Sequence, residues 1–507
     1  MWRMWSGWLL ACLLVAVSVG GWAGPAYGDG GDRRASIDRP LQQYRAQHPH
    51  ESVRVIVQSR QPAQALQATQ RAAGRVGHAL PRFGAIAATV SADQLDTLAS
   101  QPGVARVALD PRMQPVDGSG GDSEAASVYP FTVGAPWLWI TGATGRGVAI
   151  AVLDSGVQPI PDFGTPSRVV VNASFNRGAA STADQYGHGT WVAGIAAGAG
   201  IASQGAYVGI APSASIINLK VSDDGGLAHA SDVLQALSWV AENHAAYNIR
   251  VVNLSFVSSL AEGYATNLLD AGVEMVWHSG VSVVVSAGNA GANTEQYAPA
   301  NDPYVITVGA SDESSTPKTD DDSLAWFSSF GITQDGFSKP DLVAPGRHIV
   351  GPLASSGAVL AREFPGKVVD RVYISLSGTS ASAPVVSGAI ALLEQAQPTL
   401  SPDQIKWLLV HTARPLGPGA GAGELNLGLA AQHLGDVPRA NIGLTPNRLV
   451  GLAYLAATGQ SNVSWDSVSW DSVSWDSVSW DSVSWDSVSW DSVSWDSVSW
   501  DSIVGSD

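Results

Sequence analysis

Short apolar runs alternate with longer segments of helical periodicity along the middle of the chain. The largely apolar runs cover residues 148–153, 216–219, 251–254 and 281–285. Periodic segments such as 232–246 and 264–278 lie between them. Strands that are apolar on both faces and separated by helices are typical of a parallel sheet that helices cover on both sides. The pattern therefore predicts an α/β fold, with sites at the carboxyl ends of the strands.

A different order of elements precedes this region. Residues 52–109 predict strand, helix, strand, strand, helix and strand at 52–57, 62–73, 76–80, 86–90, 91–99 and 104–109. Ser91 and Gln94 fit a capping box at the start of the second helix, and Gly103 fits a stop before the last strand. This order predicts a small ferredoxin-like α+β sandwich. Residues 113–127, rich in Gly, Ser and Asp, predict an exposed connector.

The first 28 residues have the pattern of a signal peptide. Arg3 precedes an apolar run over residues 8–23, and small residues follow at a cleavage site placed after Gly28. The only cysteine, Cys12, lies in this run, so the mature protein is expected to contain no disulfide. The residues ending at Cys12 resemble a lipoprotein processing box, but apolar sequence continues beyond them. No later run is long enough to predict a retained membrane helix.

The end of the chain is a repeat. From residue 464 to residue 502 the five-residue unit Ser-Trp-Asp-Ser-Val recurs. A period of five distributes Trp and Asp over all faces of a strand or helix, so neither an amphipathic strand nor an amphipathic helix is encoded. A stack of identical turns, a strand ladder and a disordered stalk all stay open.

Charge divides the chain unevenly. Residues 29–112 contain eleven Arg, no Lys and seven acidic residues, a net charge of +4, whereas residues 113–507 carry −22. An acidic bulk repels phosphate backbones and anionic lipid, which argues against nucleic-acid or direct membrane-surface binding. The opposite signs favour docking of the first segment on the rest of the chain.

Four polar residues lie where predicted elements of the α/β region begin or end. Asp154 and Asn289 each follow an apolar run, in Asp-Ser-Gly and Ser-Ala-Gly-Asn. His188, in Gly-His-Gly-Thr, and Ser380, in Gly-Thr-Ser, open helical segments. Alone, each is more often an ordinary turn or cap residue. A serine at a helix start gains from free amides and the helix dipole, which suits an oxyanion, and four such residues at one sheet edge are hard to explain by separate caps and turns.

In this order the four motifs, ending in Gly-Thr-Ser-x-x-x-Pro, resemble the signatures of the subtilisin family of serine proteases. The resemblance covers roughly residues 130–435, and the leading sandwich is similar to that family's inhibitory propeptide. It implies that Ser380 is the nucleophile, His188 the general base and later acid, and Asp154 the group that holds the imidazole. Asn289 is implied to donate to the oxyanion beside the Ser380 amide. The sequence contains no Gly-x-Ser-x-Gly elbow, which argues against another hydrolase fold.

The resemblance also implies substrate-binding residues. Ser255, Phe256 and Val257 correspond to the segment that pairs with the substrate backbone and lines the first specificity pocket, where Ser-Leu-Gly is usual in the family. Phe256 and Val257 replace the last two, which leaves the pocket depth and preference open. Ala287 and Gly288 are implied to form the opposite wall, with room for a sizeable apolar residue.

Acidic residues 320–322 lie in the ninety-residue interval between Asn289 and Ser380, which is longer than usual for the family. They predict a solvated loop or, as the alternative, a structural calcium site. Catalysis by the implied triad requires no cofactor.

The sequence predicts a signal peptide at 1–28, a propeptide and connector at 29–125, a peptidase domain at 126–435, a linker at 436–462 and the repeat tail at 463–507. The predicted function is that of a secreted serine endopeptidase acting on proteins or peptides. Residues 29–125 are expected to template folding and to inhibit the enzyme until self-cleavage. The alternative is a surface adhesion or display protein that binds through the repeat tail, and cell-surface contact by the tail is also compatible with the enzyme.

Overall fold

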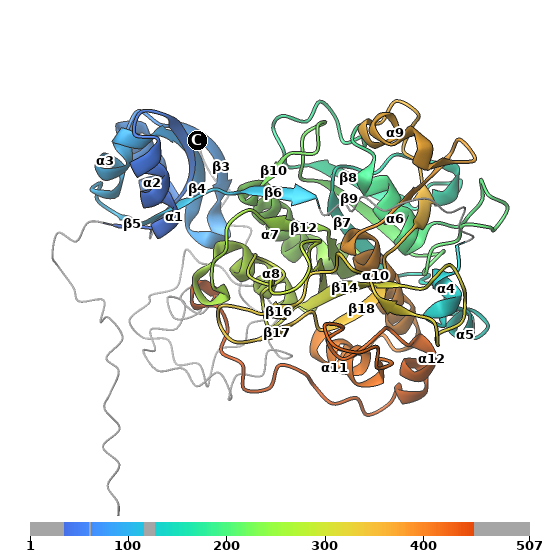
Figure 1. Ribbon diagram of the computed structural model, residues 1–507. Helices are drawn as coiled ribbons and strands as arrows, with labels where there is room; N and C mark the ends of the chain where they lie inside the picture. Colours follow the sequence, from blue (N-terminus) through green and yellow to red (C-terminus); the bar gives the residue numbers. More distant parts are fainter. Residues whose placement is uncertain (1–34, 60–61, 116–126, 451–507) are drawn as a thin grey trace, which may run out of the picture.

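A computed structural model describes residues 35–59, 62–115 and 127–450 (Figure 1). The predicted signal peptide, the repeat tail and residues 116–126 of the predicted connector lie outside these residues. The prediction of an exposed connector is wrong at its start, because Met113 is buried in the strand β6 (Arg112–Pro115).

The larger part of the described chain is built on one sheet of eight strands. Their order is β15-β14-β13-β11-β7-β9-β8, with β18 also paired to β14, and all pairs are parallel except β14 with β15. The strands are β7 (Ala149–Asp154), β8 (Val169–Ser174), β9 (Ser215–Lys220), β11 (Ile249–Leu254), β13 (Ser282–Ser286), β14 (Ile306–Asp312), β15 (Ser323–Leu324) and β18 (Leu342–Pro345). Buried side chains on both faces of β7 explain its unbroken apolar run. The structure thus has the predicted α/β architecture.

Helices cover both faces of this sheet (Figure 1). On one face α7 (Ala230–Tyr247) packs against α8 (Leu268–His278), and on the other α6 (His188–Ala197) packs against α10 (Thr379–Ala396). The predicted helix 264–278 is divided, because Asn267 caps α8 by accepting from the backbone N–H groups of Leu269 and Asp270. No helix within the described residues combines the length and apolar character that a membrane crossing requires.

Shorter elements surround this core. The helices are α4 (Tyr129–Thr132), α5 (Ala135–Trp139), α9 (Val359–Glu363), α11 (Pro402–Thr412) and α12 (Leu427–Ala430). The small strands are β16 (Gly331–Ile332), β17 (Ser338–Lys339), β19 (Ile349–Pro352), β20 (Val368–Val369) and β21 (Tyr373–Leu376).

The N-terminal elements form a separate five-stranded sheet, in the order β1-β5-β2-β4-β3. Its elements are β1 (Ser36–Ile37), α1 (Arg39–Gln47), β2 (Ser52–Ser59), α2 (Pro62–Arg71), β3 (Arg75–Leu80), β4 (Ala85–Ser91), α3 (Leu95–Ala99) and β5 (Val104–Leu109). From β2 to β5 the elements follow the predicted order. The sequence prediction did not include β1 and α1.

The capping box predicted at Ser91 and Gln94 is wrong. Ser91 is the last residue of β4, and its side chain makes no capping hydrogen bond. The chain continues through a 3₁₀ turn at Ala92–Gln94 before α3 begins, so the turn that a capping box requires is absent here.

Successive side chains of β2 alternate between two hydrophobic cores, and this shows how the N-terminal sandwich packs on the larger part of the chain. Val55 and Val57 pack in the sandwich's own core, under its helices. Ile56, between them, belongs to the core cluster of the larger part. The second face of the small sheet therefore covers the surface formed by α7 and its neighbours, and Arg82 pairs with Glu242 of α7 across this contact, Nε to Oε1, at 3.0 Å.

Candidate active site

Asp154 is the last residue of β7, at the carboxyl end of a strand in the middle of the main sheet. Its side chain is fully buried. The carboxylate oxygen Oδ1 accepts a hydrogen bond from the backbone N–H of Ser155 at 2.7 Å. A buried carboxylate needs hydrogen-bond donors of this kind, because a buried polar group without a partner is costly.

His188 is the first residue of α6 and is also fully buried. Its Nδ1 lies 2.7 Å from Asp154 Oδ1, which is hydrogen-bonding distance. The positive end of the helix dipole disfavours a cationic imidazole at this position, and the adjacent carboxylate opposes that effect. Gly189 permits the approach of the two segments, because a Cβ there would come within 2.2 Å of the Gly156 carbonyl oxygen.

Ser380 is the second residue of α10 and is fully buried. Asn289, which follows β13, reaches the same helix start: its Oδ1 accepts from the backbone N–H of Thr379 at 3.0 Å and from the Thr379 hydroxyl at 3.2 Å. These bonds fix the orientation of the amide, so that Nδ2 is the group turned to other acceptors. The structure therefore brings Asn289 beside the residue that precedes Ser380.

Two consecutive residues connect Ser380 to His188. The hydroxyl of Ser255 lies 3.5 Å from the carbonyl oxygen of Ser380, and the ring centroid of Phe256 lies 6.5 Å from that of His188. Helices α6 and α10 also pack against each other. The four residues singled out by sequence are thus collected at one edge of the sheet.

A strand from the N-terminal part lies beside these residues. The strand β6 (Arg112–Pro115) runs antiparallel between β10 (Ala228–His229) and β12 (Phe256–Ser258) (Figure 1). Val257 pairs with Gln114, so a valine at this position is compatible with a neighbouring strand. Met113 is almost completely buried. Residues 112–115 are therefore the middle strand of a small three-stranded sheet beside these residues.

The predicted opposite wall is tied to the helix start. Ala287 is buried, and the backbone N–H of Gly288 donates to the Thr379 hydroxyl at 3.1 Å. Sequence reasoning did not identify Ala228 and His229, which form the other side of the strand site. Their only sequence signal is a short segment after Gly225-Gly226, which is too weak to indicate a strand.

The acidic cluster 320–322 does not fit a calcium site. The Asp322 carboxylate is buried and accepts from Arg414 Nη2 at 2.8 Å, while Asp321 accepts from the Thr316 hydroxyl. A guanidinium beside the carboxylate opposes a second cation. Within the described residues no group of three or more His, Cys, Asp or Glu is arranged to hold a metal ion.

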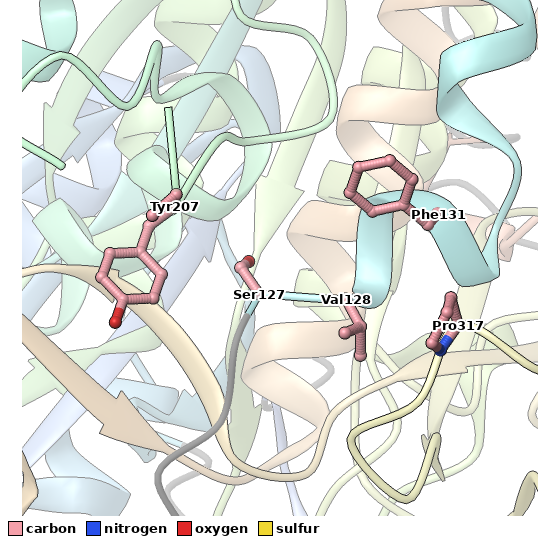
Figure 2. A pocket seen from close by; sticks show the side chains of 6 residues that line it. Ser127, Val128, Phe131, Tyr207 and Pro317 are labelled. Carbon is pink, nitrogen blue, oxygen red and sulfur yellow. The ribbon is translucent and has the colours of Figure 1, made fainter. Parts of the chain in front are cut away.

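The structure also contains an open pocket of about 460 Å³ (Figure 2). It is lined by Ser127, Val128, Phe131, Ala206, Tyr207 and Pro317. None of the candidate catalytic residues lines it, so its size alone does not make it the reaction site.

Comparison with known proteins agrees with this geometry. The model of the subtilase family matches residues 145–438. The chain is 35% identical over 272 residues to the serine protease AprX of Bacillus subtilis, covering 52% of this chain and 61% of that relative. It is 34% identical over 285 residues to subtilisin Savinase of Lederbergia lenta, covering 56% of this chain and 90% of that relative.

A solved structure shares the fold. Fervidolysin from Fervidobacterium pennivorans, described as a keratinolytic enzyme related to subtilisin, matches with a TM-score of 0.60 at 24% identity, over 77% of this chain and 62% of that one. With its family model matched over more than half its length and its motifs gathered at one sheet edge, the chain belongs to the subtilase family of serine peptidases.

Proposed function

We propose that the chain is a secreted serine endopeptidase in which Ser380, His188 and Asp154 form the catalytic triad. The observation that carries this proposal is the buried 2.7 Å contact between His188 Nδ1 and Asp154 Oδ1, beside the helix that begins with Thr379 and Ser380. The first 28 residues support secretion, since they have the pattern of a signal peptide.

In the proposed reaction Ser380 Oγ attacks the carbonyl carbon of the scissile bond while His188 Nε2 takes the hydroxyl proton. Asp154 keeps the proton of the neutral imidazole on Nδ1, so that Nε2 is the basic nitrogen, and it stabilises the cation that forms. Asn289 Nδ2 and the Ser380 amide donate to the tetrahedral oxyanion. His188 then gives its proton to the leaving amine, and water hydrolyses the acyl-enzyme by the same steps in reverse order.

The substrate is proposed to bind as an extended strand. The position of β6 between β10 and β12 supports this, because its backbone pairs with both neighbours in one register. Main-chain pairing supplies affinity without sequence selectivity, and side-chain pockets supply the preference. Proteins and peptides with an extended segment are therefore the proposed substrates.

Residues 29–125 are proposed to be an inhibitory propeptide. The Asp110 carboxylate accepts from the backbone N–H and hydroxyl of Ser231, at 3.0 and 2.7 Å, in the first turn of α7. His78 Nε2 lies 3.1 Å from Asp232 Oδ1 in the same turn. These contacts support the proposal, because they hold the sandwich so that the following strand, β6, lies between β10 and β12, where the substrate is proposed to bind.

The test compares the wild-type precursor with Ser380→Ala and with Ser382→Ala as a matched control. Ser382 lies in the same buried helix, and its hydroxyl has no hydrogen-bond partner among the described residues. Size is followed by gel and mass spectrometry, and activity by casein cleavage and labelling with a fluorophosphonate.

We expect self-shortening, casein cleavage and labelling in the wild type and in Ser382→Ala, and none of these in Ser380→Ala. A folded wild type that is unprocessed, unlabelled and inert would contradict the proposed function.

A further inference from the structure

One buried carboxylate connects the two chain segments that carry Asp154 and His188. Asp184 lies four residues before His188, between β8 and α6, and it is 2% exposed. Its Oδ1 accepts from the Ser155 hydroxyl at 2.8 Å and from the backbone N–H of Gly187 at 2.7 Å. Its Oδ2 accepts from Thr190, from the backbone N–H at 2.8 Å and from the hydroxyl at 2.6 Å.

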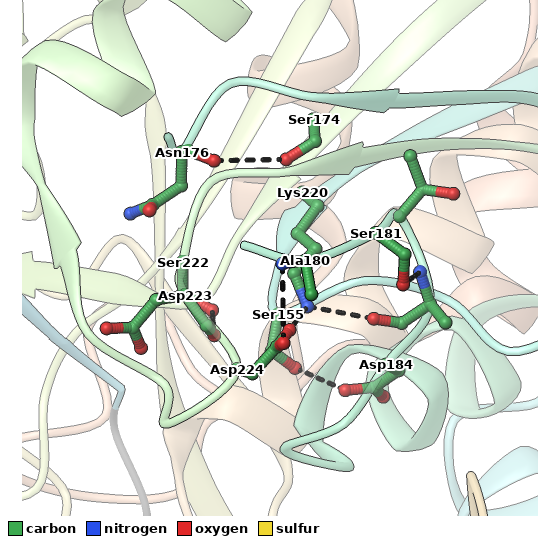
Figure 3. A network of polar contacts seen from close by, with 12 residues as sticks. Ser155, Ser174, Asn176, Ala180, Ser181, Asp184, Lys220, Ser222, Asp223 and Asp224 are labelled. Carbon is green, nitrogen blue, oxygen red and sulfur yellow. Dashed lines mark hydrogen bonds and ion pairs between the residues drawn. The ribbon is translucent and has the colours of Figure 1, made fainter. Parts of the chain in front are cut away.

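Ser155 is the other half of this connection (Figure 3). It directly follows Asp154 and is 1% exposed. Its hydroxyl donates to Asp184 and also accepts from the backbone N–H of Gly189 at 2.9 Å. One hydroxyl therefore joins the end of β7 to the loop before α6 and to the first turn of α6 itself.

These bonds replace an ordinary helix cap. The cap residue of α6, Gly187, has no side chain to bind the free amides of the first turn. Asp184 accepts from the amides of Gly187 and Thr190, and Ser155 accepts from that of Gly189. The start of α6 is thus held by groups that are fixed to the neighbouring strand end.

The loop that carries Asp184 is itself anchored to the sheet. Lys220, the last residue of β9, is fully buried, and its Nζ donates to the Ala183 carbonyl at 2.8 Å and to Asp224 Oδ1 at 2.9 Å (Figure 3). Asn218 Nδ2 donates to the Thr182 carbonyl at 3.0 Å. Asp184 therefore has little freedom to follow a displacement of α6.

We propose that Asp184 is a positioning residue of this active site: through Ser155 and the first turn of α6 it fixes the separation and alignment of Asp154 and His188. The proposal rests on the proposed function, since it assigns Asp184 to the alignment of the triad. A displacement of about 1 Å in such a pair can cost on the order of 10²-fold in rate, so groups that hold the pair have measurable kinetic effects.

The test uses the full-length precursor, allowed to process itself, with Asp184→Asn and Ser155→Ala as single and double variants. Asparagine has one acceptor oxygen and an NH₂ group in place of the second. It therefore cannot accept both from Ser155 and Gly187, as Asp184 Oδ1 does, and from Thr190, as Asp184 Oδ2 does. Ser155→Ala removes only the connecting hydroxyl. Ser181→Ala, on the same loop, is the matched control, because within the described part of the chain its hydroxyl makes one hydrogen bond, a long one accepted from the Ala183 amide at 3.3 Å.

Active sites are counted with the fluorophosphonate, and kcat, KM and the pH profile of kcat/KM are measured per labelled site. For both single variants we expect kcat to fall roughly 10- to 100-fold with little change in KM. The acidic limb of the kcat/KM profile should also move to lower pH, because a misaligned Asp154 stabilises the His188 imidazolium less. The double variant should lose little more than the worse single variant.

Labelled variants with wild-type kcat and an unchanged acidic limb would overturn this inference while leaving the protease itself intact. Additive losses in the double variant would also overturn it, because the two residues would then act separately. If Asp184→Asn does not fold, Ser155→Ala decides by the same criteria. A wild type that fails to cleave casein instead refutes the proposed function.

Discussion

His188 Nδ1 and Asp154 Oδ1 lie 2.7 Å apart, and neither side chain is exposed to solvent. The loss of a charged partner at this depth is costly, so the Asp154 carboxylate is placed to compensate the imidazolium that forms in the proposed reaction.

Asp154→Asn therefore should reduce kcat by about 10⁴-fold, because an amide favours the wrong imidazole tautomer and carries no charge. KM should change little, since Asp154 is not proposed to contact the substrate. Kinetics on enzyme counted by active-site labelling check this, and a loss of less than tenfold would contradict the assigned role.

Asn289→Ala should lower kcat by about 10²- to 10³-fold, which is less than a triad substitution. Its amide is oriented by Thr379 at the start of α10, so the lost group is one donor to the oxyanion. Steady-state kinetics check this, because they separate a loss of kcat from a rise in KM. A raised KM with normal kcat would show that Asn289 binds the substrate in its ground state instead.

Asp110→Asn should weaken inhibition of the processed enzyme by a separately added N-terminal segment. A hydrogen bond to a charged group contributes about 1.5–3 kcal/mol, which corresponds to an inhibition constant raised by roughly 10- to 100-fold. Asp96→Asn is the matched control, since Asp96 is a 67% exposed side chain that pairs with Arg45 of the same N-terminal sandwich and not with the larger part of the described chain. Equal inhibition by all three segments would mean that Asp110 does not contribute to docking.

The sequence predicted four of the eight strands of the main sheet, β7, β9, β11 and β13, and the four polar positions, because both depend on local patterns. The apolar run 148–153 fixes a strand, and a residue at its end must lie at the sheet edge. Asp184 was missed for the opposite reason: its partners Ser155 and Thr190 are joined only when β7 and α6 pack together.

The position of β6 could not be predicted either. Residues 112–115 have no strand pattern that separates them from the connector, and their partners in β10 and β12 lie more than a hundred residues away. Pairing across such a separation is a property of the folded chain. The same holds for Asp322, which was expected to be solvated but has a buried side chain paired with the partly exposed Arg414.

Glu295 gives a prediction about stability and pH. It is 1% exposed, neither carboxylate oxygen has a hydrogen-bond partner among the described residues, and burial raises its pKa to about 8, although Lys339 opposes the shift. A raised pKa means that the folded protein holds the proton more tightly than the unfolded chain. The stabilisation is fully present below about pH 4.5, the unfolded pKa, and is lost as the pH rises through about 8.

Glu295→Gln removes this titration. As the pH rises between those limits, the unfolding free energy of the parent should therefore fall relative to that of the variant by about 1.4 kcal/mol for each pH unit. Urea unfolding at pH 5 and pH 8, in a Ser380→Ala background that prevents self-digestion, measures the difference. Glu363 is an exposed carboxylate on α9, and Glu363→Gln is the control. The unfolding free energy of this variant should differ from that of the parent by nearly the same amount at both pH values. A Glu295→Gln difference that is also independent of pH would show that this carboxyl is ionised in the folded protein already at pH 5, because only a proton retained on folding couples its stability to pH.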